Sequence, residues 1–311
     1  MTNEKPLISI CIPTYNRCKS LQNILNSIVQ QNEFLEDTIE IVVSDNASTD
    51  ETKEMVAKYI KEYRNIVYFR NKENLKDKNF PLVLSEAHGK LRRLCNDTFT
   101  FRPGSLKKMC SIVNQYNESR PFIVWTNEAA KCENNIENVN FSRYIEKVSF
   151  WMTSIACFSI WDSECDNIGS DFDGCELSLW QVKKGLEIAC RKDNIVIVDS
   201  KMTDFHDVKK NVINYDLFNI FYNNYFSILN PYFESGILGE KEREYLEKDL
   251  LFRFFVNWVA KWELQPANQN NLESRDLKEA VWNAYSNKPY WNEFLDNYNA
   301  RLDFFKAKQH E

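Results

Sequence analysis

Short apolar runs alternate with amphipathic segments along the first hundred residues. Leu7 to Ile12 is an apolar run with one serine that ends at Pro13, which is typical of a strand buried on both faces. Ile39 to Val43 and Ile66 to Phe69 predict two further strands. Apolar residues at helical spacing follow the first strand (Leu21, Ile24, Leu25, Ile28 and Val29) and the second (Val56, Tyr59, Ile60 and Tyr63). This alternation predicts parallel strands joined by right-handed helical crossovers.

The pattern continues less regularly up to about residue 200. We expect helices over about 79–88 and 105–116, and strands over 91–95, 122–125 and 195–198, the last of which is the final clear strand of the chain. Residues 134–140 are polar and predict a loop. From about residue 211 the periodicity is helical throughout. We therefore divide the chain into an α/β domain, residues 1–208, and an all-helical domain, residues 209–311.

Aromatic residues are frequent at the start of the helical domain (Phe218, Phe221, Tyr222, Tyr225, Phe226, Tyr232 and Phe233). They could form a surface for peripheral membrane contact. Buried helix faces explain them better, because large apolar side chains at helical spacing usually belong to a core. The oligomeric state is not indicated by any pattern in the chain.

Composition narrows the range of partners. With 311 residues and 43% hydrophobic content, the chain can fill a sizeable core. The net charge is −6 and the basic residues are scattered, which argues against nucleic acid as a partner. There are seven glycines, and neither common glycine-rich phosphate-binding motif, G-x-G-x-x-G or G-x-x-x-x-G-K-[ST], occurs.

Cysteine usage and hydropathy indicate the compartment. The nine cysteines form no C-x-x-C pair and no zinc-type spacing, and no signal peptide is evident, so reduced thiols in the cytoplasm are the simplest account. No apolar run approaches the length of about 18 to 20 residues that crosses a bilayer. We therefore expect a cytoplasmic protein with at most peripheral membrane contact.

Polar clusters follow the predicted strands at their carboxyl ends. They comprise residues 13–17, residues 45–50, the pair Asn71 and Asn74, the pair Asn96 and Asp97, and His206. Ligands of open parallel sheets bind at this edge, near the point where the strand order reverses. The clusters therefore predict a binding site assembled from several strand ends.

The acidic residues in these clusters suggest the ligand. Asp45 suits a base or ribose contact, because an ionised carboxylate accepts hydrogen bonds from N–H and hydroxyl groups. Asp97, beside Asn96, suits Mg²⁺ or Mn²⁺, which prefer oxygen ligands and also bind substrate phosphates. Together they indicate a nucleotide diphosphate. Simpler interpretations remain open: Asp50 as a helix cap, which we favour, and Asn96-Asp97 as an ordinary turn.

Four motifs in order resemble the family 2 glycosyltransferases: ISICIPTYNR, EIVVSDNASTDET, FRNKEN and NDTFTFRPGSL. The resemblance covers residues 6–115 well and extends more weakly to about residue 210. It implies the GT-A fold, a Rossmann-like and mostly parallel central sheet flanked by helices, here with an all-helical C-terminal extension. It also implies a nucleotide-sugar donor and says nothing of which sugar is transferred.

The resemblance assigns roles to individual residues. Those expected to border the donor nucleotide are Pro13, Thr14, Tyr15, Arg17, Asp45, Asn74 and Asn96. Asp97 is expected to bind Mn²⁺ or Mg²⁺ bridging the diphosphate, although the family pattern has two acids where this chain has Asn-Asp-Thr. The departure implies weaker metal binding or a further ligand, for which His206 occupies a suitable position.

An inverting member of this family also needs a general base for the acceptor hydroxyl. The segment SDFDGCELSLWQ offers Asp171, Asp173 and Glu176, and we take Asp173 as the first candidate and Glu176 as the second. Trp151 and Trp161 lie in the expected acceptor-side segment. Each could stack on a sugar ring or belong to the core.

These observations predict a metal-dependent inverting glycosyltransferase. It would move a sugar, with UDP as the expected carrier, to a bacterial surface glycan or glycolipid such as lipopolysaccharide or capsule, at the inner face of the cytoplasmic membrane. One alternative acceptor is a protein Ser or Thr, for example in flagellin. Another alternative is a non-catalytic nucleotide-sugar binder, which the incomplete metal motif and the unclear base would favour.

Overall fold

The computed structural model of the chain describes residues 5–206, 216–264 and 272–308, without the side chains of 272–276. The chain packs as two compact units, residues 1–212 and 213–311. The boundary expected at residue 208 lies outside the described residues, and the roles assigned to the two parts remain predictions. Each unit is taken by itself below.

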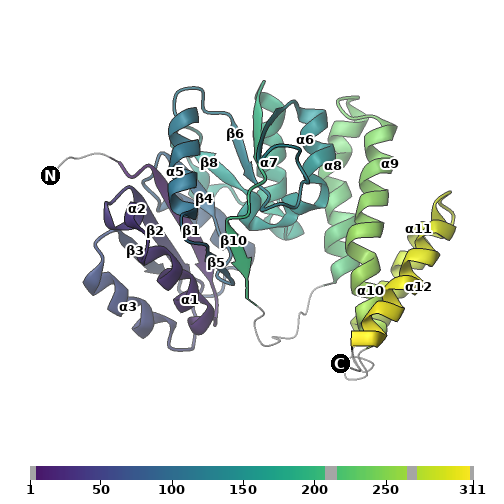
Figure 1. Cartoon of the computed structure of the whole chain (residues 1–311), viewed down its shortest axis with the longest axis horizontal. Coiled ribbons are helices and arrows are strands. Elements are labelled where there is room, and N and C mark those ends of the chain that lie inside the picture. The colour runs from purple at the N-terminus through teal and green to yellow at the C-terminus, as the bar shows by residue number, and fades with distance from the viewer. Residues whose placement is uncertain (1–4, 207–215, 265–271, 309–311) are drawn as a thin grey trace. The chain divides into compact units, whose positions relative to one another are not determined.

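The first unit is built on a five-stranded sheet with the order β3-β2-β1-β4-β8 (Figure 1). Its strands are β1 (Ile8–Thr14), β2 (Ile39–Asp45), β3 (Ile66–Arg70), β4 (Leu91–Leu94) and β8 (Ser159–Trp161). The first four are parallel and β8 is antiparallel to β4. The predicted mixed α/β fold with a mostly parallel sheet is confirmed.

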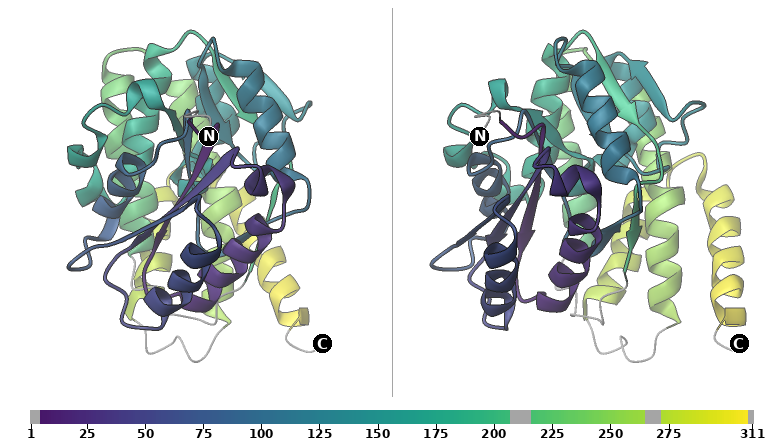
Figure 2. Two further views of the ribbon diagram at one scale, coloured as in Figure 1. Left: turned by 90° about the vertical axis from the view of Figure 1, so that its left-hand side faces the viewer. Right: turned by 60° about the vertical axis from the view of Figure 1, so that its left-hand side comes forward.

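Helices cover both faces of this sheet (Figure 2). They are α1 (Cys18–Val29), α2 (Asn32–Leu35), α3 (Thr52–Glu62), α4 (Asn79–Ser85) and α5 (Ser105–Tyr116). Since successive strand residues point to opposite faces, Ile39, Ile41 and Val43 join one core with α1, α3 and α5. Ser44 points the other way and hydrogen-bonds Asn79 of α4. The predicted apolar stripe of α1 is buried throughout.

Two smaller sheets complete the strands of this unit. One has the order β6-β9-β7, with β6 (Phe122–Trp125), β7 (Ile136–Val139) and β9 (Ile195–Val198). The expected loop at 134–140 is therefore wrong: β7 pairs antiparallel with β9, and an edge strand can be polar because one side of it faces solvent. The other is a ribbon of β5 (Phe99–Phe101) and β10 (Thr203–Phe205), so residues 195–198 are not the last strand.

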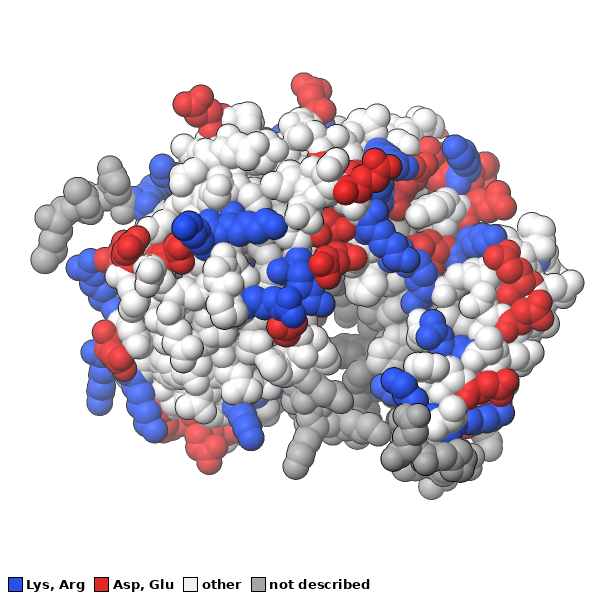
Figure 3. Space-filling model, viewed as in Figure 1, with Lys and Arg blue, Asp and Glu red and all other residues white. Residues whose placement is uncertain are grey.

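The remaining elements of the first unit are mostly short. They are the helices α6 (Phe141–Val148) and α7 (Trp180–Arg191) and the 3₁₀ turns η1 (Lys76–Lys78), η2 (Ser149–Thr153), η3 (Ile155–Cys157), η4 (Asp162–Glu164), η5 (Ile168–Ser170) and η6 (Cys175–Leu177). All nine cysteines are free. Acidic and basic side chains are interspersed on the face shown in Figure 3.

The described part of the second unit is helical. Its elements are the π-helical segments η7 (Asn219–Asn224) and η8 (Leu250–Phe255) and the helices α8 (Tyr225–Glu234), α9 (Glu240–Asp249), α10 (Val256–Glu263), α11 (Leu272–Tyr285) and α12 (Trp291–Lys308).

Aromatic side chains fill the interior of this second unit. The ring centroids of Phe221 and Phe254 lie 4.5 Å apart, and those of Tyr222 and Tyr285 lie 5.5 Å apart. Of the seven aromatic residues singled out above, Tyr225 and Phe226 are buried and the other five are half-buried, so the favoured interpretation holds for part of the set. Among the described residues, no helix combines the length and the apolar character that crossing a membrane requires.

Candidate functional site

The strand order of the main sheet reverses between β1 and β4, and the predicted site residues meet at this point. Thr14 ends β1 and Asp97 follows β4. The Thr14 hydroxyl donates a hydrogen bond of 2.8 Å to Oδ2 of Asp97, and Nη1 of Arg17 lies 2.9 Å from Oδ1. Three of the predicted residues therefore converge where open sheets bind their ligands.

The Asp97 carboxyl group is almost fully enclosed. It is 2% exposed, whereas the Arg17 side chain is 42% exposed. Burial raises the pKa of Asp97, and the Arg17 cation and the Thr14 hydroxyl oppose this shift. The ion pair is thus open to solvent on its cationic side only.

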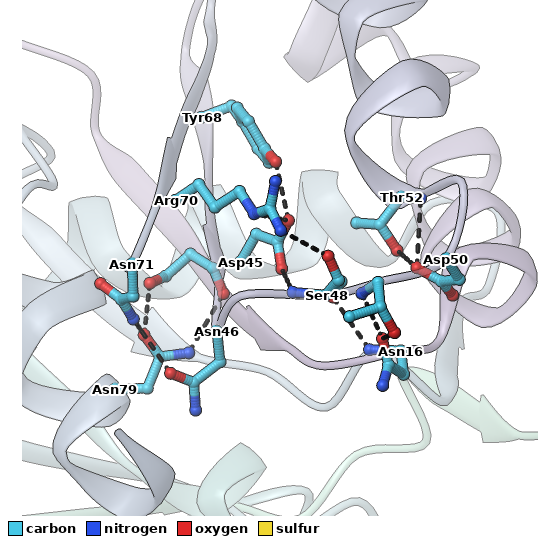
Figure 4. Close-up of polar contacts among 12 residues, drawn as sticks. Asn16, Asp45, Asn46, Ser48, Asp50, Thr52, Tyr68, Arg70, Asn71 and Asn79 are labelled. Atoms are coloured by element: carbon cyan, nitrogen blue, oxygen red, sulfur yellow. Dashed lines mark hydrogen bonds and ion pairs between the residues drawn. The ribbon is translucent and has the colours of Figure 1, made fainter. Parts of the chain in front are cut away.

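Asp45 lies at the end of β2 and is completely buried. Its Oδ1 accepts a hydrogen bond of 2.8 Å from the backbone N–H of Ser48, and its Oδ2 accepts one of 2.7 Å from the Tyr68 hydroxyl (Figure 4). Nε of Arg70 lies 3.6 Å from the same Oδ2. Burial and the hydrogen bond to the carboxylate raise the pKa of Tyr68.

Tyr68 and Arg70 are site residues that sequence reasoning missed. In the parallel register Arg70 pairs with Asp45 and Tyr68 with Val43, so alternate residues of β3 face the carboxylate. The sequence did offer one signal: Tyr-Phe-Arg stands at the end of the third predicted strand, and an aspartate follows the second. It could be used only once the register of the two strands was known.

The loops that follow β1 and β2 are tied together (Figure 4). Oδ1 of Asn16 accepts a hydrogen bond from the N–H of Thr49, and the N–H of Asn16 donates to Ser48. Asp50 accepts hydrogen bonds from the N–H of Thr52 at the start of α3 and from the N–H of Cys18 at the start of α1. The favoured role of Asp50 as a cap is confirmed, and it serves two helices.

Asn74 belongs to a network of amides that fastens the loop after β3. Nδ2 of Asn46 donates to Oδ1 of Asn74 at 2.7 Å, and Oδ1 of Asn46 accepts from the N–H of Leu75 at 2.8 Å. Asn71 and Asn79 hydrogen-bond each other in the same network (Figure 4). Asn46, which is 5% exposed, was missed because it resembles an ordinary turn residue in the sequence.

The other predicted binding residues lie nearer the surface. Tyr15 is 42% exposed, and Pro13 and Asn96 are half-buried. His206 is exposed: its backbone N–H donates to the carbonyl of Thr98, and its Nε2 lies 2.6 Å from the Thr100 hydroxyl. The ribbon of β5 and β10 therefore brings His206 beside the loop that carries Asp97.

The residues predicted to bind a metal ion do not by themselves make up a metal site. Within the ranges that the structure describes, no group of three His, Cys, Asp or Glu side chains is placed to hold a metal ion. Asp97 is the one carboxylate of the predicted metal motif, and its Oδ1 is engaged by the Arg17 guanidinium.

A pocket of about 420 Å³ lies between the loop after β3 and the segment with the candidate bases. It is lined by Leu75, Lys76, Asp77, Lys78, Phe172, Cys175 and Glu176. Asp173, the first candidate base, does not line it. The Asp173 side chain is 63% exposed and is paired with Lys183 at 2.5 Å. The structure thus brings Glu176, not Asp173, into a pocket.

The two tryptophans of the expected acceptor-side segment differ. Trp161 is 1% exposed, and its Nε1 donates to the carbonyl of Pro121 at 2.7 Å. It is a core residue, so the hypothesis that it stacks on a sugar is wrong. Trp151 is 36% exposed and its ring stacks on Phe150 with a centroid distance of 5.0 Å.

Comparison with known proteins identifies relatives of this chain. The abequosyltransferase RfbV of Salmonella typhimurium is 52% identical over 85 residues, which cover 27% of this chain and 25% of that protein. A GalNAc(5)-diNAcBac-PP-undecaprenol beta-1,3-glucosyltransferase of Campylobacter jejuni is 29% identical over 189 residues, 56% of this chain and 59% of the relative. The alignments with the first relatives thus span a quarter or less of their length.

A solved structure shares the fold along nearly the whole chain. The crystal structure of Staphylococcus aureus TarS 1–349 in complex with UDP-GlcNAc matches with a TM-score of 0.58 and 15% sequence identity, covering 97% of this chain and 92% of that one. At this identity the likeness concerns the fold alone. Residues 9–153 also match the sequence model of glycosyl transferase family 2. By its motifs, its relatives and its GT-A fold, the first unit carries a glycosyl transferase family 2 domain over residues 9–153.

Proposed function

We propose that this protein is an inverting glycosyltransferase that uses a nucleotide diphosphate sugar, with UDP as the expected nucleotide. The observation that carries the proposal is the convergence of Thr14, Arg17 and Asp97 at the point where the strand order reverses. Asp45, two strands from Asp97 along the same sheet edge, is held by Ser48 and Tyr68 for contact with the base or ribose.

Arg17 is suited to the diphosphate. Its guanidinium group is planar and always charged, and it binds phosphate oxygens through two parallel hydrogen bonds. Because the side chain is 42% exposed, it can turn from Asp97 toward a ligand with little loss of packing. We propose that donor binding draws Arg17 to the phosphates and frees Oδ1 of Asp97.

Asp97 would then be available to Mn²⁺ or Mg²⁺, with Asn96 and His206 as neighbouring ligand candidates. When bound, such an ion would supply positive charge that stabilises the departing diphosphate. The protein residues would hold the donor: Asp45 orients the nucleoside, Thr14 fixes the Asp97 carboxylate, and Arg17 holds the phosphates.

Glu176 is the stronger candidate for the general base. A base must reach the acceptor hydroxyl. Both side chains are exposed, but Glu176 lines a pocket, whereas Asp173 does not and is neutralised by Lys183. In an inverting reaction the Glu176 carboxylate would take the proton as the acceptor oxygen attacks the anomeric carbon. The donor nucleotide diphosphate then leaves on the opposite side.

A bacterial surface glycan or glycolipid is the proposed acceptor. The names of the Campylobacter jejuni relative, which includes an undecaprenol-linked glycan, and of TarS, a poly(ribitol-phosphate) beta-N-acetylglucosaminyltransferase, support acceptors of this kind. Nine free thiols support a reducing compartment, so we place the reaction at the cytoplasmic side of the membrane.

Ligand-induced stabilisation tests the donor site. Melting temperatures would be measured with UDP-, GDP-, CDP- and dTDP-sugars, with and without Mn²⁺, because a ligand that binds only the folded state raises its stability. We expect one UDP-sugar to stabilise the protein. Asp45→Asn and Arg17→Gln should weaken binding about tenfold or more, and Asp193→Asn, an exposed matched control, should not.

Turnover separates the remaining alternatives. The same donor would be incubated with lipid-linked glycans or with polypeptides, and mass gain would identify the acceptor class. If the donor binds but is neither transferred nor hydrolysed in Mn²⁺, the result would support the non-catalytic binder. The pairing of Asp97 with Arg17 favours this alternative. Failure of every nucleotide sugar to bind would contradict the proposal.

A further inference from the structure

The pocket that Glu176 lines lies beside the proposed donor site, and its lining indicates which ligand it could bind. We call it the η1–η6 pocket, because Leu75, Lys76, Asp77 and Lys78 in and before η1 form one wall and Phe172, Cys175 and Glu176 around η6 form the other. Its volume of about 420 Å³ lies within the usual range for small-molecule sites, about 300–1,000 Å³.

The first wall carries a carboxyl group without a partner. Among the described residues, no hydrogen bond or ion pair involves the side chain of Asp77, and burial raises its pKa to about 6 although Lys76 opposes the shift. A half-buried acid with no protein partner is costly to fold unless a ligand or water satisfies it. Asp77 is therefore placed to bind something that enters the pocket.

The other charged residues of the pocket are Glu176 on the second wall and Lys76 and Lys78 on the first. The Glu176 carboxylate accepts a hydrogen bond of 3.2 Å from the N–H of Gly174. Lys78 lies 5.2 Å from the centre of the Phe172 ring. Within the described part of the chain, no ion pair shorter than 4.0 Å joins the acids of the pocket to Lys76 or Lys78. The pocket thus offers acceptors, donors and an aromatic surface together.

This combination matches a sugar ring. Each hydroxyl of a sugar can donate to a carboxylate and accept from an ammonium group. Its C–H face packs on an aromatic plane such as that of Phe172. A purely anionic ligand could contact Lys76 and Lys78 but would be repelled by Asp77 and Glu176, and a purely apolar ligand would leave the Asp77 carboxylate without a hydrogen bond.

The pocket is fastened to the donor side of the sheet edge. Asn46 follows Asp45 directly, and its side chain accepts a hydrogen bond from the N–H of Leu75 at 2.8 Å and donates to the carbonyl of Lys76 at 3.4 Å. The wall that carries Asp77 is therefore held by the same strand end that carries Asp45. A sugar in the pocket would lie beside the nucleotide site.

We propose that the η1–η6 pocket binds the acceptor sugar ring, and that Asp77 selects this ring by accepting a hydrogen bond from one of its hydroxyls. The inference rests on the proposed function. Glu176, on the other wall, would face the hydroxyl that reacts. Asp77 thus acts as a specificity-determining residue, and the sugar hydroxyl pattern decides which acceptors bind.

Saturation-transfer NMR on the full chain tests this inference. The probes are the methyl glycosides of glucose, galactose, mannose, rhamnose and N-acetylglucosamine, each added with UDP present so that the nucleotide site is filled. We expect at least one glycoside to bind. Asp77→Asn should weaken that binding about tenfold, since it removes a charged hydrogen-bond acceptor, and Phe172→Ala should also weaken it.

The control is Glu73→Gln, an acid in the same loop that is exposed and does not line the pocket. It should bind the glycosides as the unchanged protein does. Asp77→Asn should also change the order of preference among the glycosides, which a purely structural role would not do.

Two results would overturn the inference: no glycoside binds the unchanged protein, or Asp77→Asn binds as tightly as Glu73→Gln. Melting temperatures with UDP-sugars on the same samples keep the two proposals apart. Stabilisation by a UDP-sugar without the glycoside effect leaves the proposed function standing and rejects the acceptor pocket. Loss of both rejects both.

Discussion

At the scale of single residues, the site is made by acids whose partners differ. Asp45 is held by Tyr68 and Ser48, Asp97 by Thr14 and Arg17, and Asp77 by no side chain among the described residues. A carboxylate that already has a cation or hydroxyl partner gives a binding site its shape. A carboxyl group without such a partner, like that of Asp77, is left to interact with a ligand or water, and burial raises its pKa.

The pH dependence of stability provides a test of the burial of Asp77. Its pKa in the folded chain is raised from 3.8 to about 6, so the folded state holds the proton more tightly than the unfolded state. Stability contributed by this group is therefore present below about pH 4 and lost as pH rises through about 6. Asp77→Asn cannot ionise and should raise the free energy of unfolding by about 1–2 kcal/mol near pH 8.

Urea unfolding of the unchanged protein and Asp77→Asn near pH 4.5 and pH 8 measures this difference. The gain should be clearly smaller near pH 4.5 than near pH 8, because most of the pH range between the unfolded pKa of 3.8 and the folded pKa of about 6 lies above pH 4.5. Glu73→Gln, exposed in the same loop, should change stability equally little at both values. A gain for Asp77→Asn that is the same at both pH values would contradict the expected titration.

At the scale of elements, the sequence predicted those helices and strands that have a local pattern and missed those that depend on long-range pairing. The strands β1, β2 and β3 and the helices α1 and α5 are predicted closely. Their signals are the hydrophobic periodicity of each segment and the Pro, Gly or Asp residues at its ends, and both can be seen in the local sequence. The polar strand β7 was missed, because the side chains of Glu137 and Asn138 gave no sign of the pairing of their backbone with β9. Trp161 was left undecided for the same reason, since its core partners come from other segments.

Asp50 links two helices and should show a capping effect larger than usual. It accepts hydrogen bonds from the first turn of both α1 and α3, at 2.9 Å from Cys18 and 3.2 Å from Thr52. Asp50→Ala should therefore lower the free energy of unfolding by about 2–3 kcal/mol, against about 1 kcal/mol for a typical single cap. Chemical denaturation measures the change.

Glu51→Ala is the matched control for this effect, because Glu51 is the adjacent exposed acid and its side chain makes no cap hydrogen bond. It should change stability by less than about 0.5 kcal/mol. If Asp50→Ala and Glu51→Ala cost the same, the double cap is not an important contact in solution.

At the scale of the whole molecule, the chain combines an α/β unit that carries the candidate site with a second unit whose described part is helical. Composition was informative here: the apolar content indicated a folded protein with a sizeable core, and the cysteine spacing indicated reduced thiols. The packing of both units around aromatic and aliphatic cores agrees with this expectation.

The free thiols give a prediction for the whole chain. Burial raises the pKa of Cys11, Cys95 and Cys157, which keeps these thiols protonated and unreactive, whereas Cys190 is exposed. Thiol titration should therefore detect Cys190 rapidly in the folded protein and all nine cysteines after unfolding. Added reductant should leave the melting temperature unchanged, and a fall in melting temperature would reveal a disulfide.

The sequence by itself determined the order of the first strands and helices, the resemblance to family 2 glycosyltransferases, and which acids lie at strand ends. These features depend on periodicity and capping within about ten residues. Only the tertiary structure decided that Arg17 pairs with Asp97 from 80 residues away, that Tyr68 and Arg70 hold Asp45, and that Glu176 shares a pocket with Asp77. Such pairs depend on strand order and register, which bring together residues that no local pattern connects.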